Sequence, residues 1–474
     1  MKNGYMKAKY FSCLKCYTLQ TLKKMVFKGL PPFESRVYFR QWNEHKSIFL
    51  LLFSILFIFI LAYFFYAPKP EQKLTFWVGG APTEINYWEK LIKDFEVSSG
   101  IKVDLVRQPS DTDQRLQSLI ISLKGKQEDP DVFLMDVVWL KHFIKSKWLQ
   151  SLDPYFERSN FNLSDFFPKI VKSVDQYQGR TFALPVFNDI ALMYYRKDLL
   201  KKYGYKNAPQ TWPAWEKCVS TILRKERKNN PNLNGYVWQG VQYEGLVCCL
   251  LEFVSSFGGG FTKDSQILLD QPQNARALQF IQNLIHTSGI TPKNVYTEMK
   301  EEEARRSFQR GQAVFERNWL YAWKLHNQPG SLVKDKVGVC SIPHLKTSRS
   351  ASTLGGWHVG ISTYSNKKAA AWKLIQFILS YESQKKLVLN VGWFPARTDI
   401  YNDKEVIKAV PHLDLITDTF TKNIVTRPNA AYYQQMSQVI QLYGNKCLAN
   451  KITPQEALLK MQREIDKIIG FYAK

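Results

Sequence analysis

The chain has 474 residues, 45% of them apolar and 14% aromatic, which is enough to bury a large core and predicts two lobes or domains rather than one. Its formal net charge is +24, yet it contains no zinc-finger spacing and no RNA-binding aromatic motif, which argues against nucleic-acid binding and for a generally basic surface. The seven cysteines follow no regular spacing, so disulfides are not expected to organise the fold.

The first 46 residues form a basic segment, with ten Lys or Arg side chains against two acids, Glu34 and Glu44. They precede an uncharged apolar run of twenty residues, Ile48 to Ala67. As a helix this run would be about 30 Å long, which matches one bilayer core. By the positive-inside rule, we expect residues 1–46 to be cytoplasmic, residues 47–67 to be a transmembrane signal anchor, and the remainder to lie across the membrane.

A cleavable signal peptide is the alternative for this apolar run. The run is longer than the ~7 to 15 apolar residues of such peptides, and neither a small-x-small cleavage site nor a lipid-accepting Cys follows it. We therefore expect an uncleaved anchor that carries an extracytoplasmic domain.

Downstream of the anchor, short apolar strands alternate with amphipathic helices. The expected elements are a strand at 73–78, a helix at 84–98, a strand at 101–107, a helix at 112–123 and a strand at 131–135. This alternation predicts βαβ units and a mainly parallel sheet, and thus the α/β class. Farther along, a helical pattern at 369–379 continues the series, and the glycines at 258–260 mark a turn.

The stretch DPDVFLMDVVWL, residues 129–140, places Asp136 at the carboxyl end of an apolar strand. A buried carboxylate needs hydrogen-bonding partners, and the nearest cation that follows it in sequence is Lys141. Ligands of parallel sheets bind beyond the carboxyl ends of the strands, so Asp136 is expected to face a crevice. Either a distant residue or a ligand satisfies this charge, and we expect the ligand.

Polar groups stand beside aromatic residues at several predicted strand ends and turns. Carboxylates hydrogen-bond to adjacent sugar hydroxyls while aromatic rings stack on sugar CH faces, so the pattern is typical of carbohydrate binding. No nucleophile, P-loop or zinc-protease motif occurs, and the histidines lack metal-ligand spacing, so neither an enzyme nor a metal or other cofactor is predicted. The pairs are Asp136 with Trp139, Phe187 with Asp189, Glu316 with Trp319, and Gly356 with Trp357.

A series of stretches in the exported part resembles the extracellular solute-binding proteins of family 1, the sugar receptors of ABC importers, and most of all their trehalose/maltose-binding branch. The similarity runs in family order from residue 73 to the C-terminus and takes in nothing before residue 68. The most specific stretches are VWQGVQYEGL (237–246) and LGGWHVGIS (354–362). The others are KLTFWVGGAPTE (73–84), DPDVFLMDVVWL (129–140), LQSLDPYF (149–156), ALPVFNDIALMYYRKDLLKKYGY (183–205), PQTW (209–212), VFERNWLYAW (314–323) and RPNAAYYQQMSQVIQ (427–441).

The resemblance implies a two-lobed periplasmic-binding-protein fold, a clamshell like that of maltose-binding protein, preceded here by one N-terminal transmembrane helix. The N-terminal lobe would comprise 73–184 plus 342–383, and the C-terminal lobe 187–337 plus 388–474. The chain would cross between the lobes near residues 184–187, near 337–342 and after Ser380.

The implied function is to bind a di- or oligosaccharide of the maltose or trehalose kind in the interlobe cleft and to deliver it to ABC permease subunits at the periplasmic face of the bacterial inner membrane. The family's sugar-binding positions fall on Glu84, Arg115, Asp136, Phe187, Asp189, Trp319, Gly356, Trp357 and Arg427. The family often has Tyr and Thr where this chain has Phe187 and Asn188, so one phenolic hydroxyl is missing.

Two other functions fit some of the same residues. Carboxylates among aromatic residues also describe a glycoside-processing enzyme. A membrane-tethered sugar sensor, with the basic N-terminal segment as its cytoplasmic output, is the third reading.

Overall fold

The computed structural model describes residues 50–57, 73–80, 82–159, 161–264 and 266–473. The basic segment 1–46 lies outside these residues. Of the expected anchor, Ile48 to Ala67, only 50–57 are described, and they are helical. Within the described ranges, no helix has both the length and the apolar character needed to cross a membrane.

The first five elements of the exported part alternate between strand and helix, as the sequence pattern predicts. Strand β1 pairs in parallel with both β2 and β3. Helix α3 covers these strands because Trp88, Leu91 and Phe95 recur on one face and are all buried. The bounds are β1 Leu74–Gly79, α3 Pro82–Ser99, β2 Val103–Gln108, α4 Thr112–Lys124 and β3 Val132–Asp136.

The main sheet is mixed, so the prediction of a mainly parallel sheet is wrong. Its strands follow the order β2-β1-β3-β12-β6-β10-β7, and β12 is antiparallel to both β3 and β6. Strand β12 returns to the sheet from a distant part of the chain, and local strand–helix alternation carries no information about such a partner. The other strands are β6 Leu184–Arg196, β7 Asn234–Val237, β10 Ala313–Trp319, β11 Val337–Cys340, β12 Ser352–Ile361, β13 Phe394–Pro395 and β14 Ile424–Val425, with short hairpins formed by β4 Gln176–Tyr177 and β5 Arg180–Thr181, and by β8 Thr262–Lys263 and β9 Gln266–Ile267.

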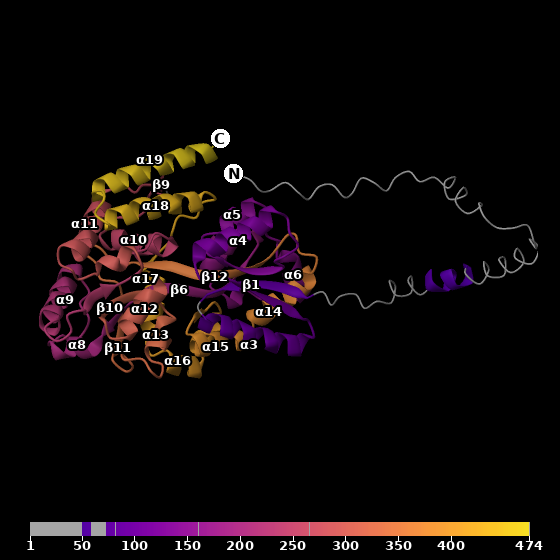
Figure 1. Ribbon diagram of the computed structural model, residues 1–474, viewed down its shortest axis with the longest axis horizontal. Helices are drawn as coiled ribbons and strands as arrows, with labels where there is room; N and C mark the ends of the chain where they lie inside the picture. The colour runs from indigo at the N-terminus through magenta and orange to yellow at the C-terminus, as the bar shows by residue number, and fades with distance from the viewer. Residues whose placement is uncertain (1–49, 58–72, 81, 160, 265, 474) are drawn as a thin grey trace, which may run out of the picture. The chain divides into compact units, whose positions relative to one another are not determined.

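Two large hydrophobic cores lie along this sheet. The smaller core gathers buried side chains of β1, α3, β12 and the helices after β12, and a satellite cluster extends it under α4 and α5. In Figure 1, α3, α14 and α15 lie below the indigo strand β1, and α4 and α5 lie above it. The helices on this side are α5 Leu140–Lys145, α6 Asp153–Ser159, α7 Pro168–Ile170, α14 Lys368–Ile378 and α15 Tyr381–Val391, with a π-helical turn at Val171–Asp175 and 3-10 turns at Leu163–Asp165 and Asp399–Asn402.

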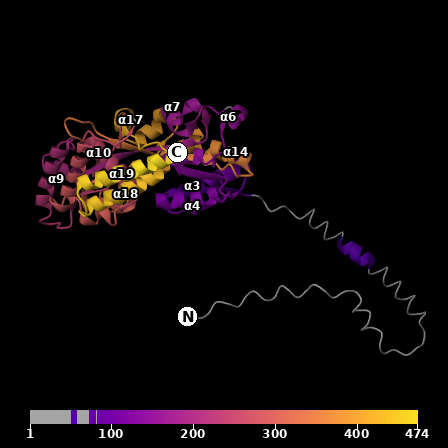
Figure 2. The same cartoon turned by 90° about the horizontal axis from the view of Figure 1, so that it is seen from above.

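The larger core is mainly helical and surrounds β6, β7 and β10. Helices α18 and α19 lie side by side (Figures 1 and 2), and α18 packs on α10 while α19 packs on α11. The helices are α8 Lys197–Lys202, α9 Trp212–Glu226, α10 Glu244–Ser256, α11 Pro272–His286, α12 Glu301–Gln309, α13 Ala322–His326, α16 Lys404–Ala409, α17 Leu413–Lys422, α18 Tyr433–Leu448 and α19 Pro454–Tyr472, with a 3-10 turn at Lys293–Tyr296.

Strands β6 and β12 connect the two cores. In β6, Phe187 packs in the smaller core and Ile190 in the larger, so the chain passes between them just beyond the predicted 184–187. The passage predicted near 337–342 lies later, because Ile342 still packs in the larger core while Val359 of β12 packs in the smaller. Strand β12 therefore makes this passage.

Candidate functional site

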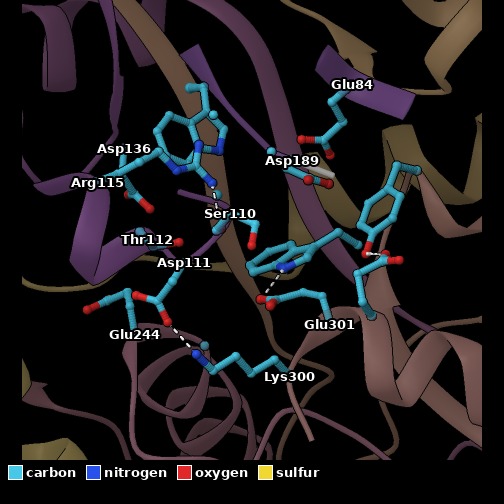
Figure 3. A pocket seen from close by; sticks show the side chains of 18 of the residues that line it. Glu84, Ser110, Asp111, Thr112, Arg115, Asp136, Asp189, Glu244, Lys300 and Glu301 are labelled. Carbon is cyan, nitrogen blue, oxygen red and sulfur yellow. Dashed lines mark hydrogen bonds and ion pairs between the residues drawn. The ribbon is translucent and has the colours of Figure 1, made fainter. Parts of the chain in front are cut away.

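A cavity of about 310 Å³ lies where strand ends of the smaller core face helices of the larger. The predicted site residues come from stretches that are far apart in the sequence, and the structure brings all of them to the wall of this one cavity. Figure 3 shows several of their side chains directed into it. They are Glu84, Arg115, Asp136, Phe187, Asp189, Trp319, Gly356, Trp357 and Arg427.

Asp136, the last residue of β3, has a cationic partner within the chain. Arg427 donates from Nη2 to Asp136 Oδ1 at 3.1 Å and from Nη1 to Glu244 Oε1 at 2.7 Å. The backbone N–H of Val138 donates to the same Oδ1 at 3.1 Å. A distant arginine therefore supplies a charge partner for Asp136, contrary to the expectation that only a ligand would, and contact between Asp136 and a ligand stays a prediction.

The arginine bridges the two sides of the cavity. Asp136 belongs to the sheet of the smaller core, whereas Glu244 begins α10 of the larger one. Glu244 also accepts hydrogen bonds from the hydroxyls of Tyr433 and Ser437 on α18. All three ionised groups are at least nine-tenths buried, so each depends on the others for its charge compensation.

Arg115 projects from α4 into the same cavity. Its guanidinium carbon lies 4.1 Å from the ring centroid of Trp357, and Nη2 donates to Ser110 O at 2.9 Å. Burial lowers the pKa of Arg115, and the nearby carboxylates of Glu84 and Asp136 oppose that shift. Its Nε has no hydrogen-bond partner among the described residues.

Glycine is required at the end of β1 to admit this arginine. A Cβ at Gly79 would collide with Cδ and Nε of Arg115 and would come within 2.8 Å of the carbonyl oxygen of Pro109. Sequence reasoning placed a strand here but did not identify this contact, since Gly79 and Arg115 are neighbours only in the fold.

Aromatic rings form much of the remaining wall. Phe187 stacks on Trp393, with ring centroids 4.2 Å apart and planes inclined by 10°. The ring of Trp319 lies 4.0 Å from the guanidinium carbon of Arg317. Trp393 and Tyr243 of the larger core were not predicted. Trp393 has no carboxylate beside it in the sequence, whereas Tyr243 is followed directly by Glu244, a signal that could have identified it. Trp393 also borders a second cavity, between α13 and α15.

Asp189 is buried, and the hydrogen bonds that it accepts from the described residues come from backbone donors. The N–H groups of Ile190 and Leu320 donate to its Oδ1 at 3.0 and 3.2 Å. The pKa of Asp189 is raised to about 7, mainly by burial and also by the neighbouring Glu301, against the two hydrogen bonds and the more distant charge of Arg317.

Three consecutive acids open α12, and each has a different role. Glu301 accepts from Tyr243 Oη at 2.8 Å and from Trp319 Nε1 at 3.4 Å. Glu302 pairs with Arg305, with 2.7 Å between Oε2 and Nη2, and accepts from the hydroxyl of Tyr321. Glu303 accepts from the backbone N–H at the start of the helix and so caps it.

Lys300, just before these acids, reaches across the cavity to Asp111, which caps α4 through Gln114 N. The dashed line between the two side chains in Figure 3 marks this ion pair. It joins the first turns of α12 and α4, and thus one side of the cavity to the other. Sequence analysis missed Asp111, Lys300 and Glu301 because their partners lie in other parts of the chain.

Comparison with known proteins identifies the class that this fold and site define. The bacterial extracellular solute-binding protein family matches residues 81–385, and the chain belongs to that family. Proteins of this class are the solute-binding components of ABC transporters and are not enzymes. A probable ABC transporter-binding protein of Deinococcus radiodurans is 36% identical over 377 residues, which cover 78% of this chain and 88% of that protein.

Solved structures show the same two-lobed α/β architecture. Maltose-bound MalE3 of T. maritima is 37% identical, covers 84% of this chain and 99% of its own, and superposes with a TM-score of 0.79. A solute-binding protein of Thermotoga lettingae with bound alpha-D-tagatose is 25% identical at the same 84% coverage, covers 99% of its own chain, and has a TM-score of 0.75. The predicted family and the two-lobed α/β fold are thereby confirmed.

Proposed function

We propose that this chain is the receptor of an ABC importer, that it holds a di- or oligosaccharide of the maltose or trehalose kind in the cavity, and that it delivers the sugar unchanged to the permease. The observation that carries the proposal is the convergence of nine residues, spread from Glu84 to Arg427, on one cavity. Their chemistry suits a sugar, since carboxylates and guanidinium groups bind adjacent hydroxyls and aromatic rings pack on CH faces.

Named relatives support a saccharide as the ligand. Maltose occupies the 37% identical MalE3 structure. A maltotriose-binding protein of Pyrococcus abyssi is 22% identical over 70% of this chain, and an arabinooligosaccharide-binding protein of Bacillus subtilis is 24% identical over 71%. Phe187 supplies a stacking surface but no hydroxyl, which alters the set of hydrogen bonds available to the sugar.

The lobes of the proposed receptor would move about the connections that join the two cores. We propose the predicted lobes, 73–184 plus 342–383 and 187–337 plus 388–474, with two boundaries moved. The second lies in β12, because Ile342 packs in the larger core, and the third lies beyond Val391, because α15 packs in the smaller core. Bending of β6 and β12 beside Phe187 and Trp357 would change the width of the cavity directly, because both residues line it.

The proposed location is the extracytoplasmic face of the inner membrane, with residues 48–67 as an uncleaved anchor. The support is the uncharged run of twenty residues and the ten basic side chains before it.

Isothermal titration calorimetry of the detergent-solubilised full chain with maltose, maltotriose and trehalose tests the function. At least one sugar should bind saturably and be recovered intact.

Trp357→Ala should weaken binding about tenfold or more, because a stacking surface and the support of Arg115 are both lost. Glu157→Gln, a change of an exposed carboxylate outside the cavity, is the matched control. Hydrolysis of the sugar, or binding of none of the three, would overturn the proposal.

A further inference from the structure

The wall of the cavity carries an excess of negative charge, in a chain whose net charge is +24. Eight carboxylate side chains line it against four cationic ones. The acids are Glu84, Asp111, Asp136, Asp189, Glu244, Glu301, Glu302 and Glu303, and the cations are Arg115, Lys300, Arg306 and Arg427.

Three of the four cations are held in ion pairs by acids of the wall. Lys300 pairs with Asp111, and Arg427 with both Asp136 and Glu244. Arg306 lies 3.8 Å from Glu302 and 3.6 Å from Glu303, measured between nitrogen and carboxylate oxygen. These three cations therefore already have carboxylate partners within the protein.

Within the part of the chain that the structure describes, Asp189 and Glu301 receive hydrogen bonds from neutral donors and form no ion pair. Asp189 is bonded by two backbone N–H groups, and Glu301 by the Tyr243 hydroxyl and the Trp319 indole. Across the described ranges, neither carboxylate has a Lys, Arg or His nitrogen within 4 Å.

Both acids belong to the part of the wall formed by Trp319. Asp189 accepts from the N–H of Leu320, the residue after Trp319, and Glu301 accepts from the indole N–H itself. Figure 3 shows Asp189 and Glu301 among the side chains that border the cavity. A desolvated carboxylate without an opposite charge is costly, and it is stabilised when a ligand supplies that charge.

We infer, resting on the sugar-binding function proposed above, that the preferred ligand carries a protonated amino group on the sugar unit next to Trp319. Asp189 and Glu301 bind this amino group, and Glu301 determines the preference for it. Asp189 loses the proton that its raised pKa of about 7 lets it keep in the empty protein, and the ammonium then donates charge-assisted hydrogen bonds to both carboxylates while the sugar ring packs against the indole. A phosphate or carboxylate on the same unit meets like charge instead and is rejected.

Arg115 gives a second, independent indication of a polar ligand in this cavity. It is only 7% exposed, and its Nε has no acceptor among the described residues. The guanidinium of Arg115 lines the cavity, so a sugar hydroxyl there can accept from it, and Nε, which is buried in the empty protein, would have to turn toward the ligand to gain an acceptor. The cavity thus contains an arginine that can bind sugar hydroxyls and two carboxylates that can bind an amine.

A matched series of trehalose derivatives tests the inference on the full chain by calorimetry at pH 7. The series is trehalose, its 2-, 3- and 4-amino-deoxy derivatives, and trehalose 6-phosphate. The best amino derivative should bind at least about tenfold tighter than trehalose, and the phosphate at least about tenfold weaker, as one charge-assisted hydrogen bond gained or lost predicts. The advantage of the amine should shrink as salt is added.

The substitution Glu301→Gln should reduce the ratio of the two affinities, amino derivative over trehalose, to below about threefold. The amide keeps the size of the side chain and one acceptor oxygen but loses the charge. Glu157→Gln should leave that ratio unchanged. Equal affinities for the neutral and amino sugars, or a ratio that Glu301→Gln does not alter, would overturn the inference while leaving the sugar receptor intact. Binding of none of these sugars, nor of maltose, would overturn both.

Discussion

Single residues at this cavity hold charges that other residues, often distant in sequence, must balance. Asp136 is the clearest example, since its position at a strand end was readable from the sequence while its partner, Arg427, was not. The two residues are separated by 291 positions, and no local pattern specifies such a pair. Glu301 was missed for the same reason, because its partner Tyr243 lies 58 residues away.

The substitution Asp136→Ala should therefore lower both ligand affinity and the stability of the empty protein. Arg427 would keep Glu244 as a partner, so we expect the free energy of unfolding to fall by about 1–3 kcal/mol, less than for a fully stranded buried cation. Urea unfolding without ligand measures this. Asp136→Asn, which still accepts a hydrogen bond, should lose less; an unchanged stability for the alanine variant would show that the ion pair contributes nothing.

Asp189 should make stability depend on pH in an unusual direction. Its pKa is raised to about 7 by burial, so between about pH 4 and pH 7 the folded chain retains a proton that the unfolded chain has lost. Stability from this group is therefore greatest at low pH and is lost as the pH rises toward 7. The groups that face it are Glu301 and Arg317.

Comparison of wild type with Asp189→Asn isolates this contribution. The difference in unfolding free energy, wild type minus variant, should decrease over that pH range by an amount on the order of 4 kcal/mol. A difference that stays constant with pH would show that Asp189 titrates normally.

Elements that depend on local pattern were predictable, and those that depend on distant pairing were not. The strands and helices from β1 to β3 matched their predicted ranges to within a few residues, because amphipathic periodicity and strand length are properties of the local sequence. The antiparallel insertion of β12 between β3 and β6 was not predicted, since it requires segments more than 160 residues apart to pair.

The first turns of α4 and α12 should act together through the pair between Asp111 and Lys300. Lys300→Met removes the ion pair but keeps the length of the side chain. The side chains are 15% and 36% exposed, so the pair is partly screened, and we expect bound sugar to dissociate only about two to five times faster. Stopped-flow measurement of the dissociation rate tests this, with Lys334→Met as an exposed control outside the cavity. An unchanged rate in the Lys300 variant would mean that the pair does not restrain opening.

At the scale of the whole molecule, two cores joined by continuous strands suit a bending motion. Small-angle scattering of the full chain should give a smaller radius of gyration when a bound sugar draws the lobes together. An identical radius with and without a ligand that calorimetry shows to be bound would argue against closure.

The proposed anchor makes a separate prediction about the mature protein. N-terminal sequencing of the chain isolated from membranes should find the residues before Ile48 still attached. A mature chain that begins near Pro68 would show instead that the apolar run is a cleaved signal peptide.

The indole rings of the cavity have a practical consequence. Trp319, Trp357 and Trp393 all line the space that the ligand would occupy, and Trp393 stacks on Phe187 beside one of the strands that connect the cores. Indole emission responds to local polarity, so ligand entry and strand bending should each change it without any attached dye. The protein is thereby its own optical reporter, and replacing these three rings one at a time would assign each part of the signal to a place in the cavity.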